Sequence, residues 1–474
     1  MVCELSDFPP GPADGQIPLC KIDGDLHYSS PEFLNLHVYT SSVSDHPNVV
    51  ISRDVLQPSL RKSYEGKVFL PTPDSMLQRL QDAWYECGII RVLEVLSQTD
   101  GQPPSLFQRL ASNILFACNI GKQLKEKFFS PSEERYFRGD EARVGPVICM
   151  SWHPSNTKLA IGTTDDSVSI FSVQTRITPV LKSKAQRRIT DIAWRPLTAG
   201  ELAVGCADGI ALWNVDPNSF VARPSSSTAV VLRHSYVTSI AWSPQGDILV
   251  SCNGMDKSIV VWHVDTKERI AVPCAGGASF LLWNPSLSKL MAATLSKTFR
   301  LWSTEKWDCE TWTTAGGRVT AAAWSHDGNC LLFATSALPY IYCLQRDRDL
   351  FGDAPPASIV ANTTFVQIPG TEDMIGGEVK KMDWDSESRH LAVLFSEGHY
   401  VAVYITSLGT TLNIQPGFLI KGISDEIPTC FSFQKDFVDG ANLTICWSTG
   451  RVQYFPMVYK RNLSSTFLRS RSAL

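Results

Sequence analysis

Short apolar segments recur along the chain from about residue 147 onward, and each ends in an aromatic residue. In the segment VTSIAWSP, the side chains of Thr238, Ile240 and Trp242 alternate with those of the intervening residues. This period of two predicts a β-strand, because successive side chains of a strand point to opposite faces of its sheet. Both faces of the segment carry apolar or small residues, so we expect both to be buried against other sheets.

Seven such segments occur, and their terminal aromatics recur at intervals of 42, 48, 41, 41, 60 and 49 residues. These first markers are Trp152, Trp194, Trp242, Trp283, Trp324, Trp384 and Phe433. A second aromatic follows each of them by 18 to 21 residues, and this second set is Phe171, Trp213, Trp262, Trp302, Tyr342, Tyr404 and Tyr454. Repeats of about 40–45 residues that form four short strands are typical of WD-repeat proteins. The sequence therefore predicts an all-β fold, a seven-bladed WD-repeat β-propeller over residues 140–458.

We interpret these fourteen aromatics as structural blade markers rather than as ligand contacts. A blade is a small sheet whose faces are buried only where neighbouring blades stack against it, and large aromatic side chains fill that space well. Proline follows the first marker by two residues at positions 154, 196, 244 and 285. Because proline lacks a backbone N–H, it ends the first strand of the blade.

The seventh repeat runs out after its third strand, near Phe455, and leaves an edge that has no fourth strand. An exposed edge carries unpaired backbone groups, so a closed ring needs a strand from elsewhere. Two N-terminal segments have the pattern of a strand, Ile17–Ile22 (IPLCKI) and residues 34–39 (LNLHVY). We interpret residues 1–72 as an extended segment that supplies this strand, and the pattern leaves both candidates open.

A helical period appears between this segment and the propeller. Apolar residues at helical spacing, such as Leu77, Leu80 and Trp84, predict helices over residues 75–97 and 104–129. Prolines and serines precede both, which is typical of helix starts. We expect a helical hairpin over residues 73–130 that either covers part of the propeller or docks a partner through Leu80 and Trp84.

Two further segments fall outside the repeat. The 60-residue interval predicts an insertion at about residues 345–378, which is either a binding element or a mobile excursion, with Phe351 as its candidate partner-binding residue. Residues 459–474 carry four basic side chains and no acidic one, so they form either a solvated tail or a contact for an acidic partner.

Composition excludes several classes of protein. The chain is 44% hydrophobic and 19% charged, as expected for a soluble globular protein, and its net charge of −4 offers no support for direct nucleic-acid binding. Its thirteen cysteines are spread widely without a CxxC motif, which favours reduced, buried thiols. The first residues lack the basic and apolar regions of a signal peptide, and no apolar run approaches the roughly 18 residues of a membrane-spanning helix. We therefore expect no direct insertion into a membrane.

Motifs for catalysis are missing from the sequence. It contains no GxxxxGK[ST], GxSxG or HExxH motif, and no GxGxxG that follows a strand. His153, His263, His326 and His390 have no second ligand at metal spacing, so we interpret them as solvated turn histidines. The starts of the first strands show no acidic residue or histidine at a position that repeats from blade to blade. We therefore expect no catalytic, cofactor-binding or metal-binding residues.

Four stretches carry a more specific likeness: SMLQRLQDAWYECGIIRVLEVLS, RPSSSTAVVLRHSYVTSIAWSPQG, LWSTEKWDCETW and CWSTGRVQYFPMVY. In these stretches the chain resembles the aladin family of WD-repeat nucleoporins. The stretches include predicted helices and outer strands that a generic propeller does not need.

The resemblance implies a non-enzymatic scaffold of the nuclear pore complex that a multi-spanning pore-membrane nucleoporin holds at the nuclear envelope. It also implies roles in nuclear protein import and at the mitotic spindle, both through protein binding. The alternative is a WD-repeat adaptor of another assembly, such as a ubiquitin-ligase substrate receptor or a coat subunit, because a fold alone does not define a function. The oligomeric state stays open.

Overall fold

The computed structural model divides the chain into two compact units, Met1–Leu56 with Val144–Leu474, and Gln57–Arg143. The residues that it describes all belong to the first unit and are 2–12, 16–29, 39, 42–44, 46–49, 51, 146–155, 158–173, 178–215, 224, 229–286, 288–345, 357–409, 411–423, 426–435, 437 and 440–459. The predicted helical hairpin with Leu80 and Trp84, residues 34–38, Phe351 and residues 460–474 lie outside this part of the chain.

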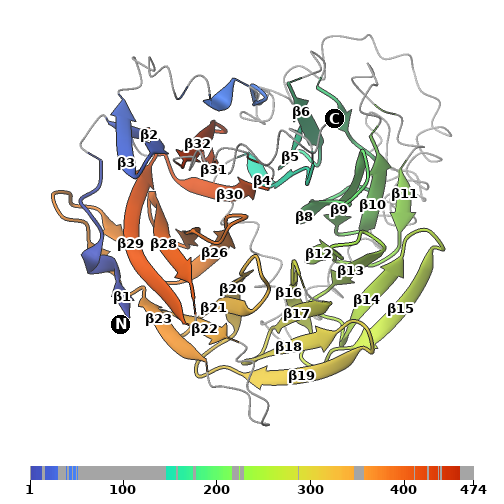
Figure 1. The fold of residues 1–474 in the computed structure, drawn as a ribbon. Coiled ribbons are helices and arrows are strands. Elements are labelled where there is room, and N and C mark those ends of the chain that lie inside the picture. The colour runs from blue at the N-terminus through green and yellow to red at the C-terminus, as the bar shows by residue number, and fades with distance from the viewer. Residues whose placement is uncertain are drawn as a thin grey trace, which may run out of the picture. The chain divides into compact units, whose positions relative to one another are not determined.

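Seven antiparallel sheets form the blades of a ring (Figure 1). Blade one contains β4 (Val147–Trp152), β5 (Lys158–Thr163), β6 (Val168–Ser172) and β7 (Val180–Leu181). Blade two contains β8 (Asp191–Trp194), β9 (Glu201–Cys206), β10 (Gly209–Asn214) and β11 (Val230–Leu232). Blade three contains β12 (Ser239–Trp242), β13 (Ile248–Cys252), β14 (Ser258–His263) and β15 (Glu268–Pro273). The first strand of each blade is the innermost one, and the fourth lies at the rim.

The remaining blades repeat this order. Blade four contains β16 (Ala278–Trp283), β17 (Lys289–Thr294), β18 (Thr298–Ser303) and β19 (Asp308–Thr313). Blade five contains β20 (Val319–Trp324), β21 (Cys330–Thr335), β22 (Tyr340–Gln345) and β23 (Ser358–Asn362). Blade six contains β26 (Val379–Trp384), β27 (His390–Phe395), β28 (Tyr400–Leu408) and β29 (Leu412–Lys421). Blade seven contains β30 (Pro428–Gln434), β31 (Gly440–Trp447) and β32 (Val452–Val458). The predicted seven-bladed all-β propeller is thus confirmed.

A row of leucines explains the spacing of the aromatic markers. In every blade the first marker pairs with a fully buried leucine of the second strand, and these are Leu159, Leu202, Leu249, Leu290, Leu331, Leu391 and Leu443. In five blades the second marker completes the row across the third strand: Phe171, Trp213, Trp262, Trp302 and Tyr404. One face of each of these blades is therefore filled from the channel to the third strand.

Blades five and seven depart from this register. Leu344, not Tyr342, pairs with Leu331, and Tyr342 pairs with Phe333 instead. Phe455, not Tyr454, pairs with Leu443. Tyr454 therefore points to the opposite face of its blade, since neighbouring side chains of a strand alternate.

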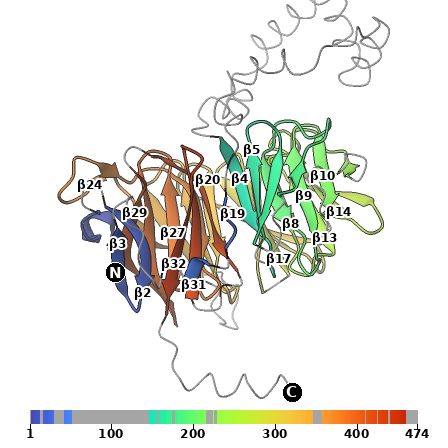
Figure 2. The same cartoon turned by 90° about the horizontal axis from the view of Figure 1, so that it is seen from above.

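The N-terminal segment supplies the missing outer strand of blade seven. Here β2 (Ile17–Ile22) pairs in parallel with β32, and β3 (Asp25–Ser29) adds a further antiparallel strand (Figure 2). The segment IPLCKI, one of the two candidates from the sequence, takes this place. Upstream of it, β1 (Cys3–Glu4) pairs in parallel with β23 of blade five, and the 3-10 helix η1 (Leu5–Asp7) follows. The first 29 residues thus contact blades at both sides of blade six.

Part of the predicted insertion belongs to the propeller itself. Residues 358–362 form β23, the outer strand of blade five, while the connection that follows it contains a hairpin of β24 (Val366–Gln367) and β25 (Met374–Ile375). The excursion that the structure describes is therefore the shorter stretch of residues 363–378.

A separate observation concerns membranes. Among the residues that the structure describes, no helix is long and apolar enough to cross a bilayer.

Candidate functional site

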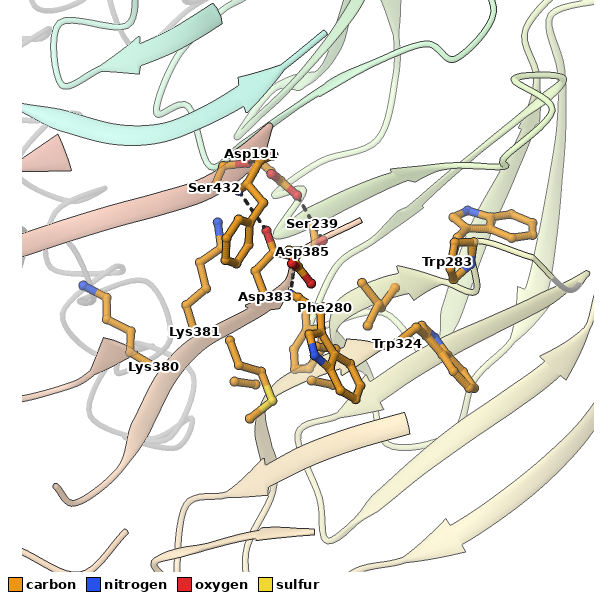
Figure 3. A pocket seen from close by; sticks show the side chains of 18 of the residues that line it. Asp191, Ser239, Phe280, Trp283, Trp324, Lys380, Lys381, Asp383, Asp385 and Ser432 are labelled. Carbon is orange, nitrogen blue, oxygen red and sulfur yellow. Dashed lines mark hydrogen bonds between the residues drawn. The ribbon is translucent and has the colours of Figure 1, made fainter. Parts of the chain in front are cut away.

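The inner strands of blades two to seven line a cavity of about 800 Å³ in the channel of the ring (Figure 3). Trp283 and Trp324 contribute half-buried rings, and the charged groups at its wall include Asp191, Asp383 and Lys381. Because this cavity collects acidic, basic and aromatic side chains from different blades, it is the candidate ligand-binding or catalytic site of the propeller.

Asp191 begins β8 and links blade two to blade three. Its carboxylate accepts hydrogen bonds of 3.0 Å from both the Ser239 hydroxyl and the Ile240 backbone N–H (Figure 3 shows the first). Burial raises the pKa of Asp191, although these hydrogen bonds oppose the shift. Its Oδ2 atom is therefore occupied by groups of the next blade, while its Oδ1 atom accepts a 2.9 Å hydrogen bond from the backbone N–H of Ile192 in its own strand.

Asp383 has the same task between blades six and seven. It accepts hydrogen bonds from the backbone N–H groups of Phe433, at 3.3 Å, and of its neighbour Trp384, at 3.0 Å. Burial raises the pKa of Asp383, while the nearby Lys381 ammonium lowers it. Lys381 itself donates a 2.8 Å hydrogen bond to the Phe431 carbonyl oxygen. These charges hold adjacent inner strands together.

A position that carries a hydroxyl group, rather than an acidic residue or a histidine, repeats along the inner strands. The residue four positions before the first marker carries a hydroxyl in five blades: Thr190, Thr238, Ser279, Thr320 and Thr429. Four of these hydroxyls donate to backbone carbonyl oxygens, which are those of Val237, Cys252, Ala293 and Cys446. These four hydroxyls therefore stabilise the inner strands, whereas the Thr320 hydroxyl is buried and has no hydrogen-bond partner among the described residues.

Two of the four histidines discussed above are not solvated, and for them that interpretation was wrong. His153 and His390 are buried, whereas His263 is half-buried and His326 is exposed. The His153 Nε2 atom lies 3.0 Å from the Thr198 carbonyl oxygen. Both rings are held by side chains or backbone of other elements, so packing rather than solvation determines their place.

His390 belongs to a network at the place where the ring closes. Its Nε2 atom lies 3.2 Å from the Lys21 ammonium, and its Nδ1 atom lies 3.0 Å from the Tyr459 hydroxyl. Tyr459 in turn donates a 2.9 Å hydrogen bond to Asp385. Within the described ranges, no group of three or more histidine, cysteine, aspartate or glutamate residues is arranged to hold a metal ion.

The fourteen aromatics interpreted as blade markers differ in burial. Eleven of the fourteen are buried, and Trp283, Trp324 and Tyr454 are half-buried. Three tryptophans also join blades, because the indole N–H groups of Trp194, Trp242 and Trp283 donate to backbone carbonyl oxygens of the preceding blade at 3.0–3.2 Å.

Comparison with known proteins gives one family over most of the propeller. Residues 136–458 match the family model described as the Aladin seven-bladed propeller. The Aladin of Arabidopsis thaliana is 26% identical over 349 residues, which cover 66% of this chain and 76% of that protein.

Other similarities are shorter or show the fold alone. The GATOR2 complex protein WDR24 of Danio rerio is 27% identical over 41% of this chain, and this match spans only 26% of that protein. The WD repeat and HMG-box DNA-binding protein 1 of Mus musculus is 28% identical over 34% of this chain and 14% of its own length. The β-propeller domain of Cps50 (Swd1) from Myceliophteria thermophila superposes with a TM-score of 0.50 at 15% identity, covering 66% of this chain and 96% of that one.

Proposed function

The chain belongs to the aladin family of seven-bladed propellers, and from this premise we propose that it is a non-enzymatic scaffold subunit of the nuclear pore complex. We further propose that a multi-spanning pore-membrane nucleoporin holds it at the nuclear envelope. The observation that carries this proposal is the family match, which extends over all seven blades from residue 136 to residue 458.

The geometry of the channel supports a scaffold rather than an enzyme. Asp191, Asp383 and Lys381 are engaged in hydrogen bonds between or within blades, which leaves the ring with a stable frame and its loops as the contact surface. In the proposed role, protein binding supports nuclear protein import and a role at the mitotic spindle. Neither direct nucleic-acid binding nor direct membrane insertion is part of the proposal.

The competing proposal is a WD-repeat adaptor of another assembly, such as a ubiquitin-ligase receptor or a coat subunit. The similarity to the GATOR2 complex protein favours this class, but it covers 41% of the chain, whereas the similarity to plant Aladin covers 66%. The longer match favours the nuclear pore.

Imaging and proximity labelling test the proposal together. We expect a fluorescently tagged chain to form a punctate rim at the nucleus of interphase cells, and a tagged biotin ligase to label a multi-spanning pore-membrane protein. A diffuse cytosolic signal without labelled pore-membrane proteins would overturn the assignment. Labelling of a ligase or coat complex instead would support the competing proposal.

Variants of the full chain then locate the contact with the membrane anchor. We expect the double substitution of Leu80→Ala and Trp84→Ala to reduce the nuclear-rim signal, and Phe351→Ala is the parallel test of the second candidate. Leu197→Ser is the matched control, since Leu197 is 83% exposed at a turn of blade two. All variants should melt like the wild type, so that a loss of rim signal reports binding rather than folding.

A further inference from the structure

The connection between blades five and six is larger than a propeller requires. The corresponding connections at residues 274–277 and 422–427 contain four and six residues, whereas residues 363–378 form a folded excursion with its own two-stranded sheet. Figure 2 shows β24 at the periphery of the ring. A turn of a few residues would join the two blades, so the excursion is not explained by the closure of the ring.

Buried and charged contacts hold the inner side of this hairpin in place. The Ile368 and Ile375 side chains are each 2% exposed and pack into the core of blades five and six. Above them, the Asp373 carboxylate accepts hydrogen bonds of 2.7 Å from the Tyr400 hydroxyl and 2.8 Å from the Lys421 ammonium. These two hydrogen bonds hold the pKa of Asp373 below its ordinary value. The hairpin is therefore a fixed part of the surface.

The outer side of the hairpin presents two large apolar side chains. Since Gln367 pairs with Met374, the alternation of side chains places Phe365 and Met374 on one face, opposite the buried Ile375. Phe365 and Met374 are each 48% exposed. The Phe365 ring lies against Gly377, where an added Cβ would come within 2.5 Å of it. The absence of a side chain at Gly377 therefore leaves room for the Phe365 ring in this position.

Three exposed glutamates lie on the excursion or on the turn next to it. Glu372 and Glu378 belong to the same excursion, and Glu397 lies in the β27–β28 turn beside Gly398, which approaches the Met374 backbone. All three are exposed, and none forms an ion pair with a described residue. We refer to Phe365, Met374 and these three glutamates as the hairpin surface.

We propose that the hairpin surface binds a segment of a partner protein in which apolar side chains lie beside lysine or arginine. A single exposed apolar residue needs no explanation, but here two are fixed on an element that the ring does not need, and three exposed glutamates lie on that element or on the turn next to it. The apolar side chains of the segment would cover Phe365 and Met374, while its cations would meet the glutamates. The proposal concerns this surface alone and does not depend on the assignment to the nuclear pore.

Synthetic peptides of defined composition test the proposal on the purified full chain. We expect a labelled peptide of alternating lysine and leucine to bind, as measured by fluorescence anisotropy, and the matched Lys/Ser and Glu/Leu peptides not to bind. The double variant F365S/M374S should weaken binding of the Lys/Leu peptide by about tenfold or more. The triple variant E372K/E378K/E397K should weaken it similarly, and added salt should weaken binding to the wild type because it screens the carboxylates.

Two matched controls separate this surface from general adhesion to an acidic protein. Ile270 on β15 is also 48% exposed, and Glu310 on β19 is exposed as well. We expect Ile270→Ser and Glu310→Lys to leave peptide binding unchanged, with all variants melting like the wild type. Equal binding of the Lys/Leu peptide to the wild type and to both hairpin variants would overturn the proposal. Self-association of the chain that F365S/M374S abolishes would also overturn it, because a second copy would then be the occupant.

Discussion

The side-chain amide of Gln453 on β32 donates a 2.9 Å hydrogen bond to the carbonyl oxygen of Pro18 on β2. The two residues are 435 positions apart in the sequence, and Lys21 and Ile22 continue the contact by pairing with β32. Blade seven is complete only when both ends of the chain meet in it. Because each blade is buried by its two neighbours, an open seventh blade would also weaken blades one and six.

The first prediction concerns this closure. Leu19 on β2 is 4% exposed, so Leu19→Ala should lower the free energy of unfolding by about 2–5 kcal/mol through lost apolar contact and the cavity left behind. Tyr28→Ala on β3, where the side chain is 39% exposed, should cost about 0.5 kcal/mol. Urea unfolding followed by tryptophan fluorescence measures both. Equal effects would mean that β2 is not part of the cooperative ring.

The second prediction concerns an inner strand. Ser239 pairs with Cys252 inside blade three, and Ser239→Pro removes its backbone N–H, which should cost about 3 kcal/mol or more. Ser239→Ala keeps the N–H and loses the hydrogen bond to Asp191, which should cost about 1–3 kcal/mol. Thermal melting compares the two variants. A proline variant as stable as the alanine variant would contradict the register of β12.

The third prediction is a dependence of stability on pH that arises from Glu426. Burial alone would raise the pKa of this carboxyl, but hydrogen bonds from Arg451 and Thr449 outweigh burial and hold the pKa below its usual 4.5. The stability that the ionised group contributes is therefore present above the unfolded pKa and is lost as the pH falls through the lower folded pKa.

The measurement is urea unfolding of the wild type and of Glu426→Gln. We expect the variant to be less stable by about 1.5–3 kcal/mol at pH 7, and this difference to shrink as the pH falls below about 4. Glu387→Gln is the control, since Glu387 forms a solvent-exposed ion pair with Arg389 that should contribute little. A difference that stays constant over this range would show that Glu426 is not ionised in the folded protein.

The fourth prediction concerns the anchor of the hairpin. Tyr400→Phe keeps the buried ring but removes the hydroxyl that donates to Asp373, so we expect faster amide hydrogen exchange across residues 363–378 and a loss of about 1 kcal/mol in global stability. Tyr404→Phe is the matched control, because the buried Tyr404 hydroxyl has no hydrogen-bond partner among the described residues. Unchanged exchange in Tyr400→Phe would mean that the Tyr400 hydroxyl does not help to hold the hairpin, and that Lys421, Ile368 and Ile375 suffice.

The repeat in the sequence predicted the blades because each inner strand must end in a large side chain at the same point of the ring. The repeat does not identify the residue that completes the buried row where two candidates lie at nearly the same distance from the first marker. Tyr342 and Leu344 share one face of β22, so the period of two does not distinguish them, and the neighbouring aromatics Tyr454 and Phe455 differ by a single step that reverses the face.

The aromatic repeat did not predict the polar contacts of the channel. Asp191 precedes its blade marker by three residues and Asp383 by one, so the two carboxylates share no position in the repeat. Each of them accepts a hydrogen bond from a backbone N–H group of the next blade, and those contacts exist only once the ring is assembled. The hairpin surface was hidden in a similar way, because the 60-residue interval did not reveal that residues 358–362 return to blade five as β23.

The pairing of β2 with β32 also determines the order of events during synthesis on the ribosome. Gln453 lies 435 positions after Pro18, so at roughly 5–20 residues per second it emerges on the order of tens of seconds later. Throughout that time Ile17 and Leu19 have no strand to join, and they are natural targets for chaperones. A premature stop codon anywhere before residue 452 would leave these residues permanently without a partner, so we expect the shortened product to be degraded rather than to act as a partial scaffold.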